Sequence, residues 1–190
     1  MNIVFIRHAK TQGNTEKRYI GRTDEGLNAE GVAQAVTLFN SGTLPRPHAL
    51  ITSPYLRSRQ TAELLYPGMA YEVNDLFREC DFGIFEGKTH AELEAATAYT
   101  AWLQSDCTTD IPGGESVTAF KQRCCQGFLE ATRARDKAAT LVFVIHGGPI
   151  MAILERFSQP KKPFYEYHVQ NCEIVTCFFD KMVLEVKQKP

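Results

Sequence analysis

Three short apolar runs constrain the fold of this chain more than any other feature of the sequence. They are NIVFI at 2–6, HALIT at 48–52 and LVFVI at 141–145. Such runs, rich in β-branched residues and bounded by polar or turn residues, predict buried strands. Segments with helical patterning separate them. This alternation predicts a largely parallel sheet covered by helices on both faces, which is a three-layer α/β/α sandwich.

Capping signals bound the predicted helices. Asn28 is a candidate N-cap for a helix over 28–40. Ser53-Pro54 predicts a cap followed by the first position of a helix that ends near Leu65. Thr89 followed by Glu92 predicts a capping box, with the helix running to Gln104. The other elements that we expect are helices over 117–133 and 149–157, a short strand over 71–73 and two final strands around a tight turn.

The bulk properties exclude several classes of protein. The 190 residues contain no repeat, low-complexity run or long linker, which predicts one domain over 1–190. A net charge of -1 favours neither a nucleic-acid surface nor a basic membrane patch. No apolar stretch approaches the about 18 residues that a membrane span needs. Basic residues interrupt the first apolar run early, so we expect no signal peptide. Six scattered cysteines without a CxxC pair predict reduced thiols in a cytoplasmic protein.

Basic and imidazole side chains follow all three apolar runs. Arg7 and His8 end the first run, and His146 with Gly147 ends the last. Arg57 lies in the first turns of the helix after the second run. Parallel strands would bring these groups to one rim of the sheet, where ligands of such sheets bind. Arginine, imidazole and free backbone N–H groups together suit a doubly charged phosphoryl group, although each motif alone is weak.

The same residues carry a resemblance to a known family. RHAKTQGN (7–14) resembles the RHGxTxxN signature of the histidine phosphatase superfamily, the phosphoglycerate mutase-like proteins. Further blocks of that family have counterparts in the correct order along the chain. They are GRTDEGLNAEGVAQA (21–35), SPYLRSRQTAE (53–63), FRECDFGIFEG (77–87), PGGES (112–116) and VIHGG (144–148). The resemblance implies a phosphoglycerate mutase-like α/β fold for the whole chain.

It also implies roles for individual residues. His8 would be the nucleophile that is transiently phosphorylated, and Glu79 would protonate the leaving oxygen. The groups expected around the phosphoryl group are Arg7, Asn14, Arg57, His146 and Gly147. The residues expected on the leaving-group side are Tyr19, Ile20, Gly21 and Arg22, together with residues from the segment 82–105. Elementary chemistry agrees, because an unprotonated imidazole can attack phosphorus while arginines neutralise the equatorial oxygens. No metal or cofactor is expected.

Two positions depart from the family pattern, and several residues stay without a role. Ala9 replaces the usual glycine and Phe85 the usual tryptophan; neither change removes a proposed chemical group. Glu86 competes with Glu79 as the acid, and the family pattern favours Glu79. Packing or solvated roles are expected for Trp102, His48 and His90. For His168 a structural role is favoured, and a contact on the substrate side stays open.

Three functions remain open at this point. The leading hypothesis is a metal-independent phosphomonoester hydrolase, with α-ribazole 5′-phosphate as a named candidate substrate. The second is a phosphoglycerate mutase, which the compact stretch between Glu79 and PGGES disfavours. The third is a phosphate-dependent sensor or scaffold without turnover, which the presence of every proposed catalytic group disfavours. An edge strand near the C-terminus would permit a homodimer.

Overall fold

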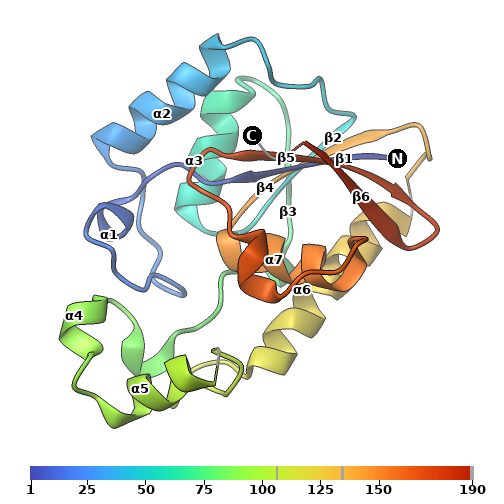
Figure 1. The fold of residues 1–190 in the computed structure, drawn as a ribbon. Helices are drawn as coiled ribbons and strands as arrows, with labels where there is room; N and C mark the ends of the chain where they lie inside the picture. The colour runs from blue at the N-terminus through green and yellow to red at the C-terminus, as the bar shows by residue number, and fades with distance from the viewer. Residues whose placement is uncertain (106, 134, 189–190) are drawn as a thin grey trace.

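A six-stranded sheet forms the centre of the structure, a computed structural model that describes residues 1–105, 107–133 and 135–188 (Figure 1). Its strands are β1 (Asn2–Arg7), β2 (Ala49–Thr52), β3 (Glu72–Val73), β4 (Thr140–Ile145), β5 (Ile174–Asp180) and β6 (Val183–Gln188), in the spatial order β3-β2-β4-β1-β5-β6. The strands β3, β2, β4 and β1 pair in parallel, whereas β5 and β6 are antiparallel. The prediction of a mostly parallel sheet is therefore confirmed.

Alternate residues of each central strand enter different apolar cores. Ile3 and Phe5 pack toward α6 (Val117–Arg133) and α7 (Gly147–Phe157). Val4 and Ile6 pack toward α2 (Ala29–Asn40) and α3 (Leu56–Leu65). Because strand side chains alternate between the two faces, one continuous apolar run supplies both cores. The helix pairs cover opposite faces of the sheet (Figure 1), which confirms the three-layer sandwich.

The start of α3 differs from the prediction. Ser53 and Pro54 precede the helix, which begins at Leu56. The Ser53 hydroxyl is already engaged, since its Oγ lies 2.7 Å from His146 Nε2 and accepts a bond from the Tyr55 N–H. The Leu56 N–H instead donates to Asp24 Oδ1 at 2.6 Å, so the first turn is capped by a residue distant in sequence.

The predicted helix over 89–104 is interrupted. The capping box of Thr89 and Glu92 is confirmed, but the helix it opens is the short α4 (His90–Leu93), and α5 (Thr97–Gln104) follows separately. The break allows both helices to turn apolar side chains into a third core around Phe85. These two helices lie to one side of the sandwich (Figure 1).

The remaining segments are short. Helix α1 (Gln12–Thr15) follows β1, and single 3₁₀ turns cover Asp75–Phe77, Gly83–Phe85 and Phe164–Tyr167. None of the six cysteines, all of which are described, forms a disulfide. Within the described ranges, no helix has the length and apolar character that crossing a membrane requires.

Candidate active site

The carboxyl ends of three parallel strands meet at one edge of the sheet. Arg7 is in register with Ile145 across β1 and β4, and Thr52 is in register with Val144 across β2 and β4. His8 and His146, which follow these strands directly, therefore lie side by side with ring centroids 5.1 Å apart. The arrangement expected from the strand-end pattern is present, because parallel pairing carries all three chain segments to the same rim.

The environment of His8 determines which ring nitrogen can react. Its Nδ1 lies 2.8 Å from the backbone carbonyl of Ala9. A carbonyl oxygen can only accept, so Nδ1 carries the hydrogen and Nε2 carries the lone pair. Burial, together with the charges of Arg57 and Arg7, lowers the pKa of His8 well below 6.5. The imidazole is thus neutral at physiological pH, with a free nucleophilic nitrogen.

His146 is also neutral, but its hydrogen lies on the other ring nitrogen than in His8. Arg57 Nε donates to His146 Nδ1 at 3.2 Å, and a guanidinium cannot accept. The hydrogen therefore lies on Nε2, which donates to Ser53 Oγ at 2.7 Å. Burial first, and then the charge of Arg57, lowers the pKa of His146 well below its usual value. The ring is held rigidly on both sides.

Arg57 is anchored by every nitrogen of its guanidinium. Besides the bond from Nε, its Nη1 donates to the carbonyl of Thr23 at 2.7 Å and its Nη2 to that of Gly21 at 2.8 Å. The side chain is 1% exposed. Burial lowers the pKa of Arg57 from its ordinary value, and the charge of Glu79 is the largest influence in the opposite direction. A guanidinium retains its charge under such conditions, so a buried cation contacts His146 and acts electrostatically on His8.

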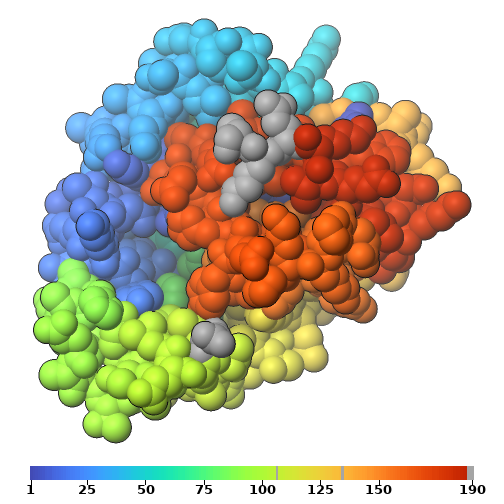
Figure 2. Space-filling view, viewed as in Figure 1, coloured from blue at the N-terminus to red at the C-terminus, as the bar shows by residue number. Residues whose placement is uncertain are grey.

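A cavity of about 700 Å³ adjoins this cluster through Arg7 and Gly147, whereas the buried His8, Arg57 and His146 are not among the residues that line it. Arg7, Asn14, Glu79, Gly147 and Gly148 contribute to its wall. Its aromatic lining consists of Tyr19, Phe82, Trp102, Phe120, Phe164 and Tyr165. The lining residues come from the N-terminal segment, the segment 79–82, the α5 region, α6, α7 and the segment after α7. The first of these, the α5 region and the segment after α7 meet on one face of the molecule (Figure 2).

Arg7 and Asn14 belong to the wall of this cavity, and both side chains carry hydrogen-bond donors. Arg7 Nη1 donates to the carbonyl of Val169 at 2.7 Å, while its Nε, though buried, has no hydrogen-bond partner within the described chain. Asn14 Oδ1 accepts from the N–H of Thr11 at 3.2 Å. Because that N–H can only donate, the atom facing it must be the oxygen, which leaves the Nδ2 of Asn14 for the cavity.

Glu79 lies on the same wall, next to the start of α7. Its Oε2 accepts the N–H of Gly148 at 3.1 Å, and its Oε1 accepts the N–H of Cys80 at 2.9 Å. Any side chain at position 148 would collide with Glu79 Oε1 and would lie 2.8 Å from Phe120 Cζ. The bare backbone of Gly148 is therefore what allows the carboxylate to reach this place.

The structure separates the residues expected on the leaving-group side. Tyr19 and Ile20 line the cavity. Gly21 lies against the backbone of Cys80, where an added Cβ would clash, and its carbonyl anchors Arg57. Arg22 has a largely exposed side chain and pairs with Asp81 at 3.4 Å. These two positions thus support the cavity from outside its wall.

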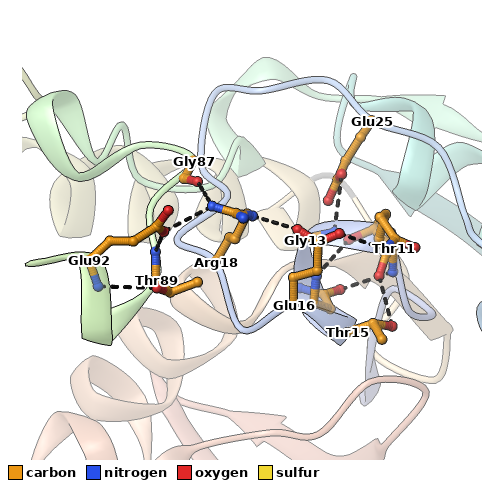
Figure 3. Close-up of polar contacts among 11 residues, drawn as sticks. Thr11, Gly13, Thr15, Glu16, Arg18, Glu25, Gly87, Thr89 and Glu92 are labelled. Atoms are coloured by element: carbon orange, nitrogen blue, oxygen red, sulfur yellow. Dashed lines mark hydrogen bonds and ion pairs between the residues drawn. The ribbon is translucent and has the colours of Figure 1, made fainter.

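Arg18 ties the N-terminal segment to the α4 region (Figure 3). Its Nη1 donates to the carbonyl of Gly87 at 2.7 Å and to Glu92 at 3.0 Å, and its Nε donates to Glu16 at 2.6 Å. Its backbone N–H also bonds to the carbonyl of Gly13. Because Arg18 lines the cavity too, these contacts tie one cavity wall to Gly87 and Glu92, which lie outside the lining.

The glutamate that competed with Glu79 has a different environment. Glu86 Oε1 accepts the N–H groups of Gly21 and Thr23, each at 2.9 Å, and Oε2 accepts the N–H of Phe82 at 3.3 Å. Three backbone donors occupy this carboxylate. It therefore anchors the loop whose carbonyls hold Arg57, rather than facing the cavity.

Several residues without an expected role also have defined places. His48 Nδ1 accepts the N–H of Thr140 at the opposite end of β4, and His90 Nδ1 lies 2.8 Å from the hydroxyl of Tyr99. His168 and Trp102 line the cavity, so the packing role expected for Trp102 describes only part of its surroundings. Among the described residues, no group of three or more His, Cys, Asp or Glu side chains is placed to hold a metal ion.

The segment 169–173 wraps the end of β1, and no pattern in the sequence predicted a role for it. Val169 accepts from the Arg7 guanidinium, and the backbones of Cys172 and Glu173 bond to the backbone of Arg7. Asn171 Nδ2 donates to the carbonyl of His8 at 2.9 Å and lies 3.1 Å from Asn14 Oδ1. No motif marks this segment, because its role depends on contacts with residues more than 150 positions away.

Comparisons with known proteins agree with this geometry. The model of the histidine phosphatase superfamily (branch 1) matches residues 3–188. The chain is 33% identical to the metal-independent phosphoserine phosphatase of Arabidopsis thaliana over 83% of its own length and 68% of that protein. It is 28% identical to phosphoserine phosphatase 1 of Hydrogenobacter thermophilus, over 80% and 74% of the two chains. It spans only 43% of a bifunctional Mycobacterium tuberculosis protein with which it shares 32% identity.

Solved structures share the fold over nearly the whole chain. TTHB049 from Thermus thermophilus is 31% identical, with a TM-score of 0.77 over 100% of this chain and 98% of that one. A putative alpha-ribazole-5′-P phosphatase from Escherichia coli is 22% identical, with a TM-score of 0.87 over 100% and 95%. Because only 22% of the residues are identical, the likeness to the Escherichia coli protein shows a shared fold alone.

Proposed function

This chain belongs to the histidine phosphatase superfamily and is a phosphate-ester hydrolase, and we propose that it acts through a phosphohistidine formed on His8. The observation that carries the proposal is the polarity of the His8 ring. The hydrogen bond from Nδ1 to the Ala9 carbonyl leaves Nε2 unprotonated, and a strongly lowered pKa keeps it so. Arg7 and Asn14, which belong to the cavity wall, offer donors to the phosphoryl group.

In the first step, Nε2 of His8 forms a bond to phosphorus as the bond from phosphorus to the leaving oxygen breaks. Arg7, the Asn14 amide and the N-terminus of α7 at Gly147 stabilise the equatorial oxygens. Arg57 and His146 act from behind, where the buried cation favours an anionic phosphoryl group and disfavours protonation of His8. This division of roles follows from the full anchoring of Arg57.

In the first step Glu79 reacts in its protonated form, gives that proton to the leaving oxygen and becomes a carboxylate. It lies on the cavity wall, with its carboxyl oriented by the Gly148 N–H. In the second step, water attacks phosphorus, the bond from phosphorus to Nε2 breaks, and Glu79 takes the proton of the water. Both steps balance without a metal or a cofactor.

The cavity bears on the choice of substrate. Its volume of about 700 Å³ falls within the range of about 300–1,000 Å³ for pockets that enclose drug-sized ligands. Six aromatic side chains line it, and aromatic walls favour a flat, apolar leaving group. These features support α-ribazole 5′-phosphate as a candidate. O-phospho-L-serine, named for the Arabidopsis and Hydrogenobacter relatives, is the comparison substrate with a small polar leaving group.

The test combines substrate specificity with chemical trapping of the intermediate. A panel of α-ribazole 5′-phosphate, O-phospho-L-serine, phosphoglycerates, sugar phosphates and nucleotides is assayed for phosphate release with and without EDTA. We expect EDTA-insensitive hydrolysis and an acid-labile, base-stable phosphoprotein. Isomerisation of 3-phosphoglycerate in place of phosphate release would instead indicate a mutase.

The variant His8→Ala should lose both turnover and labelling. His48→Ala is the matched control, because His48 is exposed at the far end of the sheet and should leave both unchanged. Full activity in His8→Ala would refute the mechanism. Tight binding of phospho-ligands without turnover of any panel member would indicate a sensor.

A further inference from the structure

Asn171 joins the two groups on which the proposed chemistry depends. Its Nδ2 donates to the backbone carbonyl of His8 at 2.9 Å and lies 3.1 Å from Oδ1 of Asn14. It comes from the turn between the 3₁₀ segment at Phe164–Tyr167 and β5, which is remote in sequence from both residues. A single amide therefore connects the nucleophile segment to the phosphate-side amide.

The orientation of both amides follows from groups whose hydrogen-bonding roles are fixed. The His8 carbonyl can only accept, so the atom of Asn171 facing it is Nδ2. The Thr11 N–H can only donate, so the atom of Asn14 facing it is Oδ1. The contact between the two side chains is then Nδ2–H of Asn171 to Oδ1 of Asn14, which agrees with both constraints. Neither amide can turn over without losing hydrogen bonds on both sides.

We propose that Asn171 is a positioning residue that locks the Asn14 amide with its Nδ2 toward the phosphoryl group and ties that amide to the His8 backbone. The inference rests on the phosphohistidine mechanism proposed above. Besides the bond from Asn171, Oδ1 of Asn14 accepts a hydrogen bond from the Thr11 N–H at 3.2 Å. Without Asn171 that single long bond would have to resist rotation of the amide. A flipped Asn14 would direct a carbonyl oxygen at the anionic phosphoryl group and repel it.

The test is a double-mutant cycle measured on a phosphomonoester that the wild-type enzyme hydrolyses. Asn171→Ala should lower kcat/KM about tenfold. A loss of this size is expected when a hydrogen bond is removed that orients the Asn14 amide toward the charged phosphoryl group. It should also weaken inhibition by orthovanadate by a similar factor. In the Asn14→Ala background, Asn171→Ala should lower kcat/KM by about threefold or less, because the amide that Asn171 positions is absent. An equal loss in both backgrounds would overturn the proposal.

A second variant reverses the polarity of the contact. Asn171→Asp places acceptors against the His8 carbonyl and Asn14 Oδ1, which favours the flipped Asn14 amide, so it should lose more activity than Asn171→Ala. Wild-type activity in Asn171→Asp would also overturn the proposal. Gln170→Ala is the matched control, since it removes an exposed amide from the same turn and should retain wild-type kinetics. Melting temperatures of all variants show that the comparison is made on folded protein.

Failure of this inference can be told apart from failure of the mechanism. If the wild-type protein forms no phosphohistidine, or if His8→Ala remains labelled, the mechanism is wrong. If wild-type labelling depends on His8 while Asn171→Ala matches the wild type in kcat, KM and vanadate inhibition, only the role of Asn171 is wrong.

Discussion

The substitution Gly148→Ala tests the place of Glu79 without removing its carboxyl group. An added Cβ at position 148 would collide with Glu79 Oε1, lie 3.1 Å from Glu79 Cδ and lie 2.8 Å from Phe120 Cζ. Because the carboxyl is the flexible end of its side chain, it can move away while the backbone stays in place. Alanine also favours the helix that begins at this point, by up to about 1 kcal/mol over glycine. The fold should therefore survive with a displaced acid.

The expected loss depends on the leaving group. A positioned general acid contributes about 10²–10⁴-fold to rate. We expect Gly148→Ala to lower kcat on alkyl phosphates by about 100-fold, which is about 2.7 kcal/mol of transition-state stabilisation. An alkoxide needs the proton, whereas 4-nitrophenolate leaves without one. On 4-nitrophenyl phosphate the loss should accordingly be small, about fivefold or less.

The assay is steady-state phosphate release from the two esters, with Glu79→Gln as the reference for a missing acid. Gly147→Ala provides the contrast, because an added Cβ there comes no closer than 3.6 Å to Arg7. Any loss of kcat in Gly147→Ala should be the same for both esters, because the added methyl group lies beside Arg7 and would affect binding of the phosphoryl group rather than the leaving group. An equal loss on both esters in Gly148→Ala, or unchanged activity on alkyl phosphates, would refute the assignment of Glu79.

Three further predictions concern pH, the Arg57 anchor and the departure from the family pattern. The folded-state pKa values of His8 and His146 lie below 6.5, so protons bind the unfolded chain first as the pH falls. The melting temperature should therefore drop from pH 6.5 downward, and a constant value between pH 7 and 5.5 would contradict this. Glu86→Gln should weaken the three hydrogen bonds that Glu86 accepts from backbone N–H groups. We expect the free energy of unfolding, measured by chemical denaturation, to fall by about 1–3 kcal/mol, and kcat to fall with it. Ala9→Gly removes a fully buried methyl group, so it should cost about 1 kcal/mol of stability and leave catalysis intact; a gain in stability would show that the methyl is strained.

The layers of the fold follow from local patterns in the chain. The apolar runs at β1, β2 and β4 are buried on both faces, and a strand of that kind needs helices on either side of its sheet. The parallel order then places the groups after each strand on one rim. For that reason the cluster of His8, Arg57 and His146 could be predicted before any contact was known.

Local signals were less reliable where a distant residue supplies the partner. The Ser53-Pro54 pattern has the chemistry of a helix cap, but the Ser53 hydroxyl bonds to His146 and Asp24 caps the helix instead. The helix predicted over 89–104 breaks because burial around Phe85 outweighs the continuity of the local pattern. In each case tertiary contacts contribute more free energy than local propensity does.

The sequence by itself determined which reactive groups this protein has and which end of the sheet they occupy, since both depend on residue type and strand direction. The tertiary structure alone decided their protonation and orientation. The lowered pKa of His8 depends on its burial and on Arg57, the tautomer of His146 on Arg57 and Ser53, and the orientation of the Asn14 amide on Asn171. A hydrogen bond depends on distances of a few tenths of an ångström between atoms that only the folded chain brings together.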